Sequence, residues 1–181
     1  MPFAYYQRLS ARDKTVYLKS DSIRSVRVPD AVGLHPLVTA LELALAADDR
    51  RGVQAAATAL AEGLTRRLGV EPVDVEILAV RPALRAAELH GLYTYGNGRT
   101  PRIRVWMRTV RYRRVVAFRT FLRTLLHELC HHLDYRYLKL AESFHTQGFF
   151  MRESSLFRQL VPEEELGRSD RRPGRRGSAL G

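Results

Sequence analysis

The spacing of apolar residues changes twice along this chain of 181 residues, from helical to alternating and back to helical. Apolar residues recur every three or four positions over residues 36–47 and again over 50–68, and this pattern predicts a helical hairpin with the polar break ADDRR at its turn. Ser10 stands where an N-cap belongs, ahead of a short predicted helix over residues 11–20. The segment SIRSVRV, residues 22–28, alternates and predicts a strand.

The second half of the chain begins with a period of two. VDVEILAV, residues 73–80, alternates as a half-buried strand does. Residues 88–108 predict two strands joined across Gly96-Asn97-Gly98, because Asn-Gly is a strong hairpin signal. Helical spacing then covers residues 115–140 and, after a break, Thr146 to Leu160. We therefore expect an α+β fold in which a small antiparallel sheet packs against helices.

Length and composition indicate one globular unit with a tail. Hydrophobic residues make up 45% of the chain, so a core can form. We expect a single domain over residues 1–167, helical over about 1–70, and a disordered basic tail over 168–181, which has almost nothing to bury. No secretory signal and no apolar run of about 20 residues is present, and Cys130 is the sole cysteine. These features favour a cytoplasmic protein without a membrane segment.

The charge is strongly positive and unevenly distributed. The net charge is +11, and no acidic residue lies between Glu88 and Glu128, whereas nine arginines fall there. This Arg-rich segment, residues 99–123, makes nucleic acid a candidate partner. The alternative is a solvated basic face without a ligand, since charge alone is weak evidence for binding.

The segment LLHELCHHLDY, residues 125–135, contains the order H-E-x-x-H at His127, Glu128 and His131. On a helix with about 100° per residue, the two histidines fall opposite an apolar stripe and share their side with Thr124. Short hydroxyls and imidazoles on that side suit a cleft better than bulk solvent. The apolar stripe consists of Phe118, Leu122, Leu125, Leu129 and Leu133, flanked by Phe121 and Leu126.

This spacing has a chemical use. Side chains four residues apart on a helix lie about 5–6 Å from each other, so two imidazoles can bind one zinc ion at about 2.0–2.1 Å. Glu128 points to the flank of the pair, where its carboxylate can take a proton from a zinc-activated water without being a ligand. The motif alone is only suggestive, because it also occurs by chance and can be a pair of surface histidines.

A catalytic zinc usually has a third protein ligand. His132 lies about 140° around the helix from His127 and cannot join the pair. Asp134 is on the same helix and suits a role in orienting a histidine. Glu142 and His145 follow the helix, so the chain can fold back and bring either one over the site. The spacing leaves both open.

The segment HELCHHLDYRYLKLAESFHTQGFF, residues 127–150, resembles the SprT-like, zincin-type metallopeptidases, and RESSLFRQL, residues 152–160, resembles uncharacterised bacterial members. The resemblance implies His127, His131 and His145 as zinc ligands, Glu128 as the catalytic base, and a packing element at Gly148 and Phe149. It also implies that PRIRVWMR, residues 101–108, is the edge strand that pairs with an extended substrate. Some relatives act on proteins attached to DNA, which the basic segment would suit.

The chain departs from the family pattern at several points. Thirteen residues separate His131 from His145, no C-x-x-C zinc ribbon follows, and the first 70 residues match no known pattern. Glu142 therefore stays an alternative third ligand. Cys130 lies toward the apolar side and reads as a small buried residue. A tyrosine or arginine often stabilises the oxyanion in such enzymes, but the sequence does not select one among the tyrosines near the motif.

The sequence thus predicts a zinc metallopeptidase with a peptide or protein substrate. The alternative is a basic nucleic-acid-binding module with a structural or inactive zinc site, whose binding would fall steeply with salt. A third option is a zinc hydrolase acting on something other than peptides.

Overall fold

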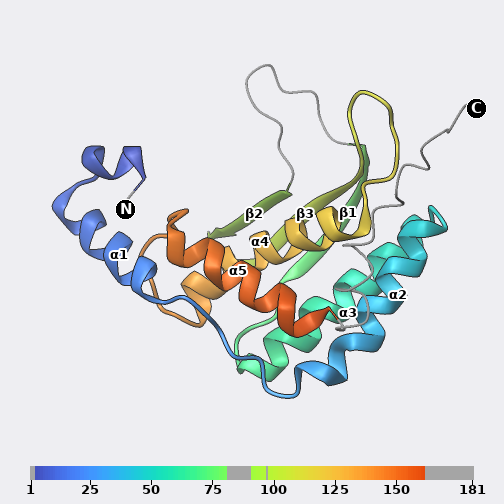
Figure 1. The fold of residues 1–181 in the computed structure, drawn as a ribbon, viewed down its shortest axis with the longest axis horizontal. Coiled ribbons are helices and arrows are strands. Elements are labelled where there is room, and N and C mark those ends of the chain that lie inside the picture. The colour runs from blue at the N-terminus through green and yellow to red at the C-terminus, as the bar shows by residue number, and fades with distance from the viewer. Residues whose placement is uncertain (1–2, 81–90, 97, 162–181) are drawn as a thin grey trace, which may run out of the picture.

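The computed structural model describes residues 3–80, 91–96 and 98–161, and in these ranges the fold is α+β, as predicted (Figure 1). The predicted tail, residues 168–181, lies outside them. No helix in the described part of the chain is long and apolar enough to cross a membrane. In chain order the elements are η1 (Ala4–Arg8), α1 (Ala11–Ser22), η2 (Ala31–Leu34), α2 (His35–Ala46), α3 (Arg50–Leu68), β1 (Asp74–Val80), β2 (Gly91–Gly96), β3 (Arg99–Arg108), α4 (Phe118–Arg136) and α5 (Gln147–Leu160).

The sheet is mixed, which corrects the prediction of an antiparallel one. Its strand order is β1-β3-β2, with β3 antiparallel to β2 and parallel to β1. The chain reverses direction between β1 and β2 and again between β2 and β3, so β3 runs in the same direction as β1. Because β3 then lies between the other two strands, PRIRVWMR is the central strand and not the predicted edge strand.

The two faces of the sheet differ in chemistry. On one face, Ile103, Val105 and Met107 of β3 are buried in the core. On the other face, Arg102 pairs with Asp74 at 3.6 Å and Arg104 with Glu76 at 2.8 Å, and each pair joins register partners on β3 and β1. Alternation along the strand therefore separates a helix-covered face from an ionic solvent face.

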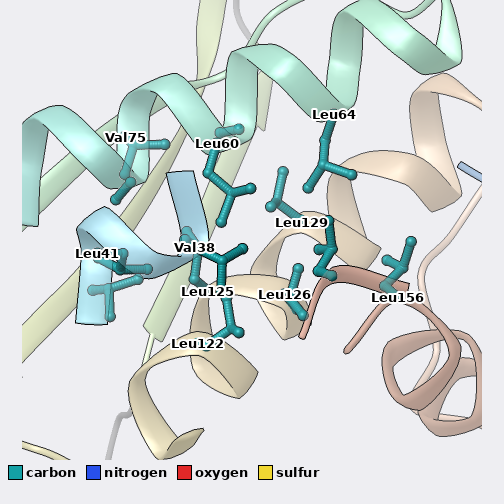
Figure 2. Close-up of a cluster of buried hydrophobic side chains, with 14 of the residues drawn as sticks. Val38, Leu41, Leu60, Leu64, Val75, Leu122, Leu125, Leu126, Leu129 and Leu156 are labelled. Atoms are coloured by element: carbon teal, nitrogen blue, oxygen red, sulfur yellow. The ribbon is translucent and has the colours of Figure 1, made fainter. Parts of the chain in front are cut away.

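Helix α4 packs against the apolar face and forms the centre of the core (Figure 1). Its predicted stripe is buried from Leu122 onward, with Leu122 and Leu125 fully inaccessible to solvent, and Phe118 at the start of the helix is partly buried. Figure 2 shows the leucines of α4 meeting side chains from α2, α3, β1 and α5 in one cluster. The labelled members are Val38, Leu41, Leu60, Leu64, Val75, Leu122, Leu125, Leu126, Leu129 and Leu156.

Helix α4 is shorter than the predicted 115–140. At its start, Val115 forms an isolated antiparallel bridge with Arg108, so this residue extends the strand region instead of the helix. At its end, Lys139 has a positive φ of 53°, which breaks the helical path, and the N–H of Leu140 returns to the carbonyl of Asp134 at 2.9 Å.

The predicted strand over residues 22–28 is not a strand, although the chain there is extended. Val26 and Val28 are buried while Arg27 between them is exposed, so the alternation is real. The side-chain amide of Gln159 on α5 satisfies their backbone, donating to the carbonyl of Val26 at 2.8 Å and accepting from the N–H of Val28 at 2.9 Å. A helix side chain therefore takes the place of a neighbouring strand.

Candidate metal centre

Helix α4 aims His127 and His131 away from the core. Both imidazoles are half-buried, whereas Leu125 and Leu129 on the opposite side of the helix are almost inaccessible. The two rings lie 5.1 Å apart between centroids, as expected for residues one turn apart. The amphipathic pattern of the helix therefore directs the pair into a cleft.

His145 comes from the turn between α4 and α5, and its ring folds back over the pair. Its Nε2 lies 3.0 Å from the Nε2 of His127 and 3.1 Å from the Nε2 of His131. Ligand atoms of the three residues all lie within 4.8 Å of one another. Among the described residues, these three form the one group of His, Cys, Asp or Glu side chains arranged to hold a metal ion.

A carboxylate fixes the orientation of His127. Its Nδ1 lies 3.2 Å from Oε2 of Glu153, a residue of α5 that is only 9% exposed. Because a carboxylate accepts hydrogen bonds, this Nδ1 carries the proton and donates it. The lone pair of His127 is then on Nε2, which faces the other two imidazoles.

A hydroxyl fixes His131 in the same way. Ser143 donates its proton to Oδ2 of Asp134 at 2.8 Å, so its oxygen accepts the Nδ1–H of His131 at 2.7 Å. Asp134 is fully buried and is also bonded to Arg152 at 2.8 Å. Asp134 thus orients a histidine, but through Ser143, and it leaves the lone pair of His131 on Nε2.

The three Nε2 atoms cannot all be hydrogen-bonded to one another. With the protons of His127 and His131 on Nδ1, His145 has at most one Nε2–H to share between two lone pairs. A tetrahedral zinc with bonds of about 2.0–2.1 Å would hold its nitrogen ligands about 3.3 Å apart, a few tenths of an ångström wider than these pairs. The donor set and its spacing therefore fit a zinc ion with three histidine ligands.

Burial favours the neutral imidazoles that bind metals. It lowers the pKa of His131 to about 3, with the neighbouring His127 and His145 adding to the effect. The pKa of His145 is also lowered, first by burial and then by His127.

Glu128 lines the same cleft and is held against β2. It is 6% exposed, and burial raises its pKa to about 7, although His127 and the backbone N–H of Tyr93 act in the opposite direction. A Cβ on Gly91 would lie 2.5 Å from Oε1 of Glu128 and 2.6 Å from its Cγ. The carboxylate therefore occupies space that only a glycine on β2 leaves open.

Gly148 and Phe149 form the packing element beneath the imidazoles. The ring of Phe149 is fully buried and lies 4.8–5.2 Å from the rings of all three histidines. Thr146 caps α5 by accepting the N–H of Phe149 at 2.9 Å. A Cβ on Gly148 would lie 2.4 Å from the carbonyl oxygen of Asp21, so the glycine lets α5 approach α1 closely.

The N-terminal segment supports the third histidine. The hydroxyl of Tyr5 donates to the carbonyl of His145 at 2.8 Å. Arg152, 1% exposed, donates to the carbonyls of Ser20 and Ile23 and also binds Asp134. One buried guanidinium thus connects α1, α4 and α5 behind the site.

The cleft has a volume of about 670 Å³ and runs along α4 and β2. In the described chain β2 pairs only with β3, and residues of β2 line the cleft. The opposite edge of the sheet is closed, because Gln54 donates to the carbonyl of Val75 at 2.7 Å and accepts the N–H of Ile77 at 2.8 Å. The lining consists of Gly91, Leu92, Tyr93, Tyr95, Arg123, Thr124, His127, Glu128, His131, Tyr135, Ser143, His145 and Glu153.

Other residues weighed from the sequence lie apart from the three imidazoles. His132 is fully buried, donates from Nε2 to the carbonyl of Glu71 at 3.0 Å and accepts the Tyr93 hydroxyl on Nδ1 at 3.1 Å. Glu142 is exposed and accepts the hydroxyl of Tyr135 at 3.3 Å. Cys130 is 1% exposed, in agreement with its interpretation as a buried residue.

About half of the Arg-rich segment is engaged within the protein. Besides the two pairs on the sheet, Arg108 binds Asp48 at 2.6 Å and Arg123 binds Glu153 at 3.3 Å. The arginines of the loop between β3 and α4 are exposed, and Arg111 and Arg114 there lie 5.0 and 5.6 Å from the ring of Tyr112. The number of arginines in this segment therefore overstates the positive charge that is available to bind a ligand.

Sequence reasoning missed Glu153, Ser143 and Gly91. A signal for Glu153 was present, because Arg152 and Glu153 interrupt the apolar stripe of α5, and charged residues on a buried face need partners. Nothing in the local sequence marked Ser143 or Gly91, whose roles depend on which residues lie across the fold.

Comparisons with known proteins add nothing to this picture: no family model, no curated protein and no solved structure matches the chain significantly.

Proposed function

We propose that this chain is a zinc-dependent metallopeptidase of the SprT-like, zincin type. The observation that carries the proposal is the convergence of three Nε2 atoms, from His127, His131 and His145, beside the buried carboxylate of Glu128. The adjacent cleft and the unpaired side of β2 suit an extended peptide, since a strand edge binds a chain through backbone hydrogen bonds.

The residues of the chain have distinct roles in this reaction. A zinc ion held by the three histidines would polarise the scissile carbonyl and lower the pKa of the attacking water. Glu128 accepts the proton of that water and delivers it to the leaving amine, so one water is consumed as the amide bond breaks into a carboxylate and an amine. Glu153 and Ser143 keep the protons of His127 and His131 on Nδ1.

Metal analysis of purified variants tests the ligand set. We expect about one zinc per chain in the wild type and in Glu142→Ala, and none in His145→Ala, because only His145 faces the other two imidazoles. Zinc lost from Glu142→Ala but kept by His145→Ala would reverse this assignment.

Peptide hydrolysis tests the reaction. Glu128→Gln keeps the shape of the side chain but removes the base, so we expect full zinc content and a loss of activity of about 100-fold or more on an internally quenched peptide library. Wild-type activity in this variant would contradict the role of Glu128.

Nucleic-acid binding is a second candidate, favoured by one observation. Tyr112 is 62% exposed between two arginines, an arrangement that can stack on a base and neutralise phosphates. If this is the function, binding to single-stranded DNA falls steeply with salt and in Tyr112→Ala, and Glu128→Gln leaves it unchanged.

A further inference from the structure

The lining of the cleft is divided into an ionic half and an aromatic half. Its described charged residues are Arg123, Glu128 and Glu153. Arg123 and Glu128 lie on α4 before His131, and Glu153 lies on α5. Beyond His131 the lining carries no described charge and is formed by the rings of three tyrosines, Tyr93, Tyr95 and Tyr135.

The three tyrosines form one preformed cluster. Tyr95 lies 4.1 Å from Tyr135 and 5.8 Å from Tyr93, and Tyr93 lies 6.1 Å from Tyr135. Two hydroxyls are already used, since Tyr93 donates to His132 and Tyr135 donates to Glu142, which is not part of the cleft lining. With these polar groups satisfied, the cluster presents mainly ring surface, and Tyr95 is 46% exposed.

The cluster also has a defined place relative to the imidazoles. Strand β2 and helix α4 run in the same direction, because Gly91 lies beside Glu128, Tyr93 beside His131 at 6.5 Å, and Tyr95 beside Tyr135. An extended chain advances about 3.3 Å per residue, and Tyr93 lies two residues beyond Gly91, which contacts Glu128, so the cluster begins about two residues along β2 from this carboxylate. A peptide antiparallel to β2 has its N-terminal part over the tyrosines.

We infer that Tyr93, Tyr95 and Tyr135 form a specificity subsite for an aromatic or large aliphatic side chain about two residues before the scissile bond. The inference rests on the proposed function, because it takes the ligand to be a peptide extended along β2. Arg136 lies 5.9 Å from the ring of Tyr95, but it is not part of the cleft lining. The surface that the three tyrosines present to the cleft is therefore aromatic, and such a surface favours apolar side chains.

Direct binding tests the subsite without requiring turnover. The probes are fluorescein-labelled octapeptides of Ala and Ser that carry Phe, Leu, Lys or Glu at the second position before the central bond, titrated against Glu128→Gln. We expect the Phe and Leu peptides to bind about tenfold tighter than the Lys and Glu peptides. Tyr95→Ala in the same background should remove this difference, and Tyr95→Phe should keep it.

Tyr137→Ala is the matched control, since Tyr137 is 42% exposed near the end of α4 but does not line the cleft. Equal binding of all four peptides, or a preference that survives in Tyr95→Ala, overturns the inference. Cleavage of the four peptides at equal rates by zinc-loaded wild type would also overturn the inference of a subsite, but it would support the proposed peptidase activity. Tyr95-dependent binding without any cleavage by zinc-loaded wild type would retain the subsite and reject the peptidase.

Discussion

At the scale of single residues, the position of Glu128 depends on the absence of a Cβ at Gly91. Its carboxylate and Cγ lie where a Cβ of Gly91 would be, at 2.5 and 2.6 Å. A Cβ at position 91 could displace the terminal oxygen of Glu128 by a simple rotation of the carboxylate. The Cγ is closer to the helix backbone and has less conformational freedom to move away. Any larger residue at position 91 must therefore move the whole side chain of Glu128.

Replacing Gly91 tests this contact. We expect Gly91→Ala to retain zinc, because no ligand touches it, but to lower kcat/KM about 10- to 100-fold by displacing the base. Peptide hydrolysis and metal content are measured on the same preparation. Thr94→Ala, an exposed position on the same strand, serves as the control. Unchanged activity in Gly91→Ala would show that Glu128 is free to relocate without cost.

At the scale of elements, α5 supports the candidate metal centre. Two consecutive residues of this helix reach α4: Glu153 binds His127 directly, and Arg152 binds Asp134, which reaches His131 through Ser143. The buried face of a helix normally carries apolar side chains. Here Arg152 and Glu153 lie on the buried face of α5, and each has a partner on α4.

The contact between Glu153 of α5 and His127 leads to a prediction about the affinity for zinc. Without its carboxylate, Glu153→Ala no longer holds the Nδ1 proton of His127, and we expect zinc binding to weaken about 10- to 100-fold. Competition with a chromogenic zinc chelator measures the dissociation constant. Glu142→Ala removes an equal charge from an exposed position outside the three imidazoles and should leave the constant unchanged. Equal affinity in both variants would deny Glu153 this role.

At the scale of the whole molecule, side-chain contacts connect the N-terminal elements η1 and α1 to the candidate site. Arg152 donates to backbone carbonyls at the end of α1 and to Asp134 on α4, and the Tyr5 hydroxyl holds the carbonyl of His145. The close contact of Gly148 with Asp21 joins α5 to α1 without an intervening side chain. Elements η1 and α1 therefore support the third imidazole.

Arg152→Leu tests this connection through stability. The substitution leaves the carboxylate of Asp134 buried without its cation, so we expect the free energy of unfolding to fall by about 3–5 kcal/mol. Urea denaturation followed by circular dichroism gives this value. Arg158→Leu changes an exposed arginine of the same helix and should stay within about 0.5 kcal/mol of wild type. A small loss in Arg152→Leu would mean that the buried network adds little to folding.

The sequence by itself determined the local features. The predicted helix over residues 50–68 agrees with α3, and the hairpin signal around Gly96 falls between β2 and β3. The stripe of leucines on α4 fixed which side of that helix is buried, and hence that His127 and His131 point the other way. These features depend on side-chain periodicity and turn chemistry, which act over a few residues and can be read along the chain.

Only the tertiary structure decided the rest. The same three strands could form a sheet in either order, and burial of β1 against α3 with β3 beside it made the sheet mixed instead of antiparallel. An extended segment became an irregular one because Gln159, more than 130 positions later in the chain, satisfied its backbone. The neighbours of the histidines, Glu153, Ser143 and Gly91, are likewise contacts between elements. Such contacts depend on which surfaces pack together, and no local pattern encodes that choice.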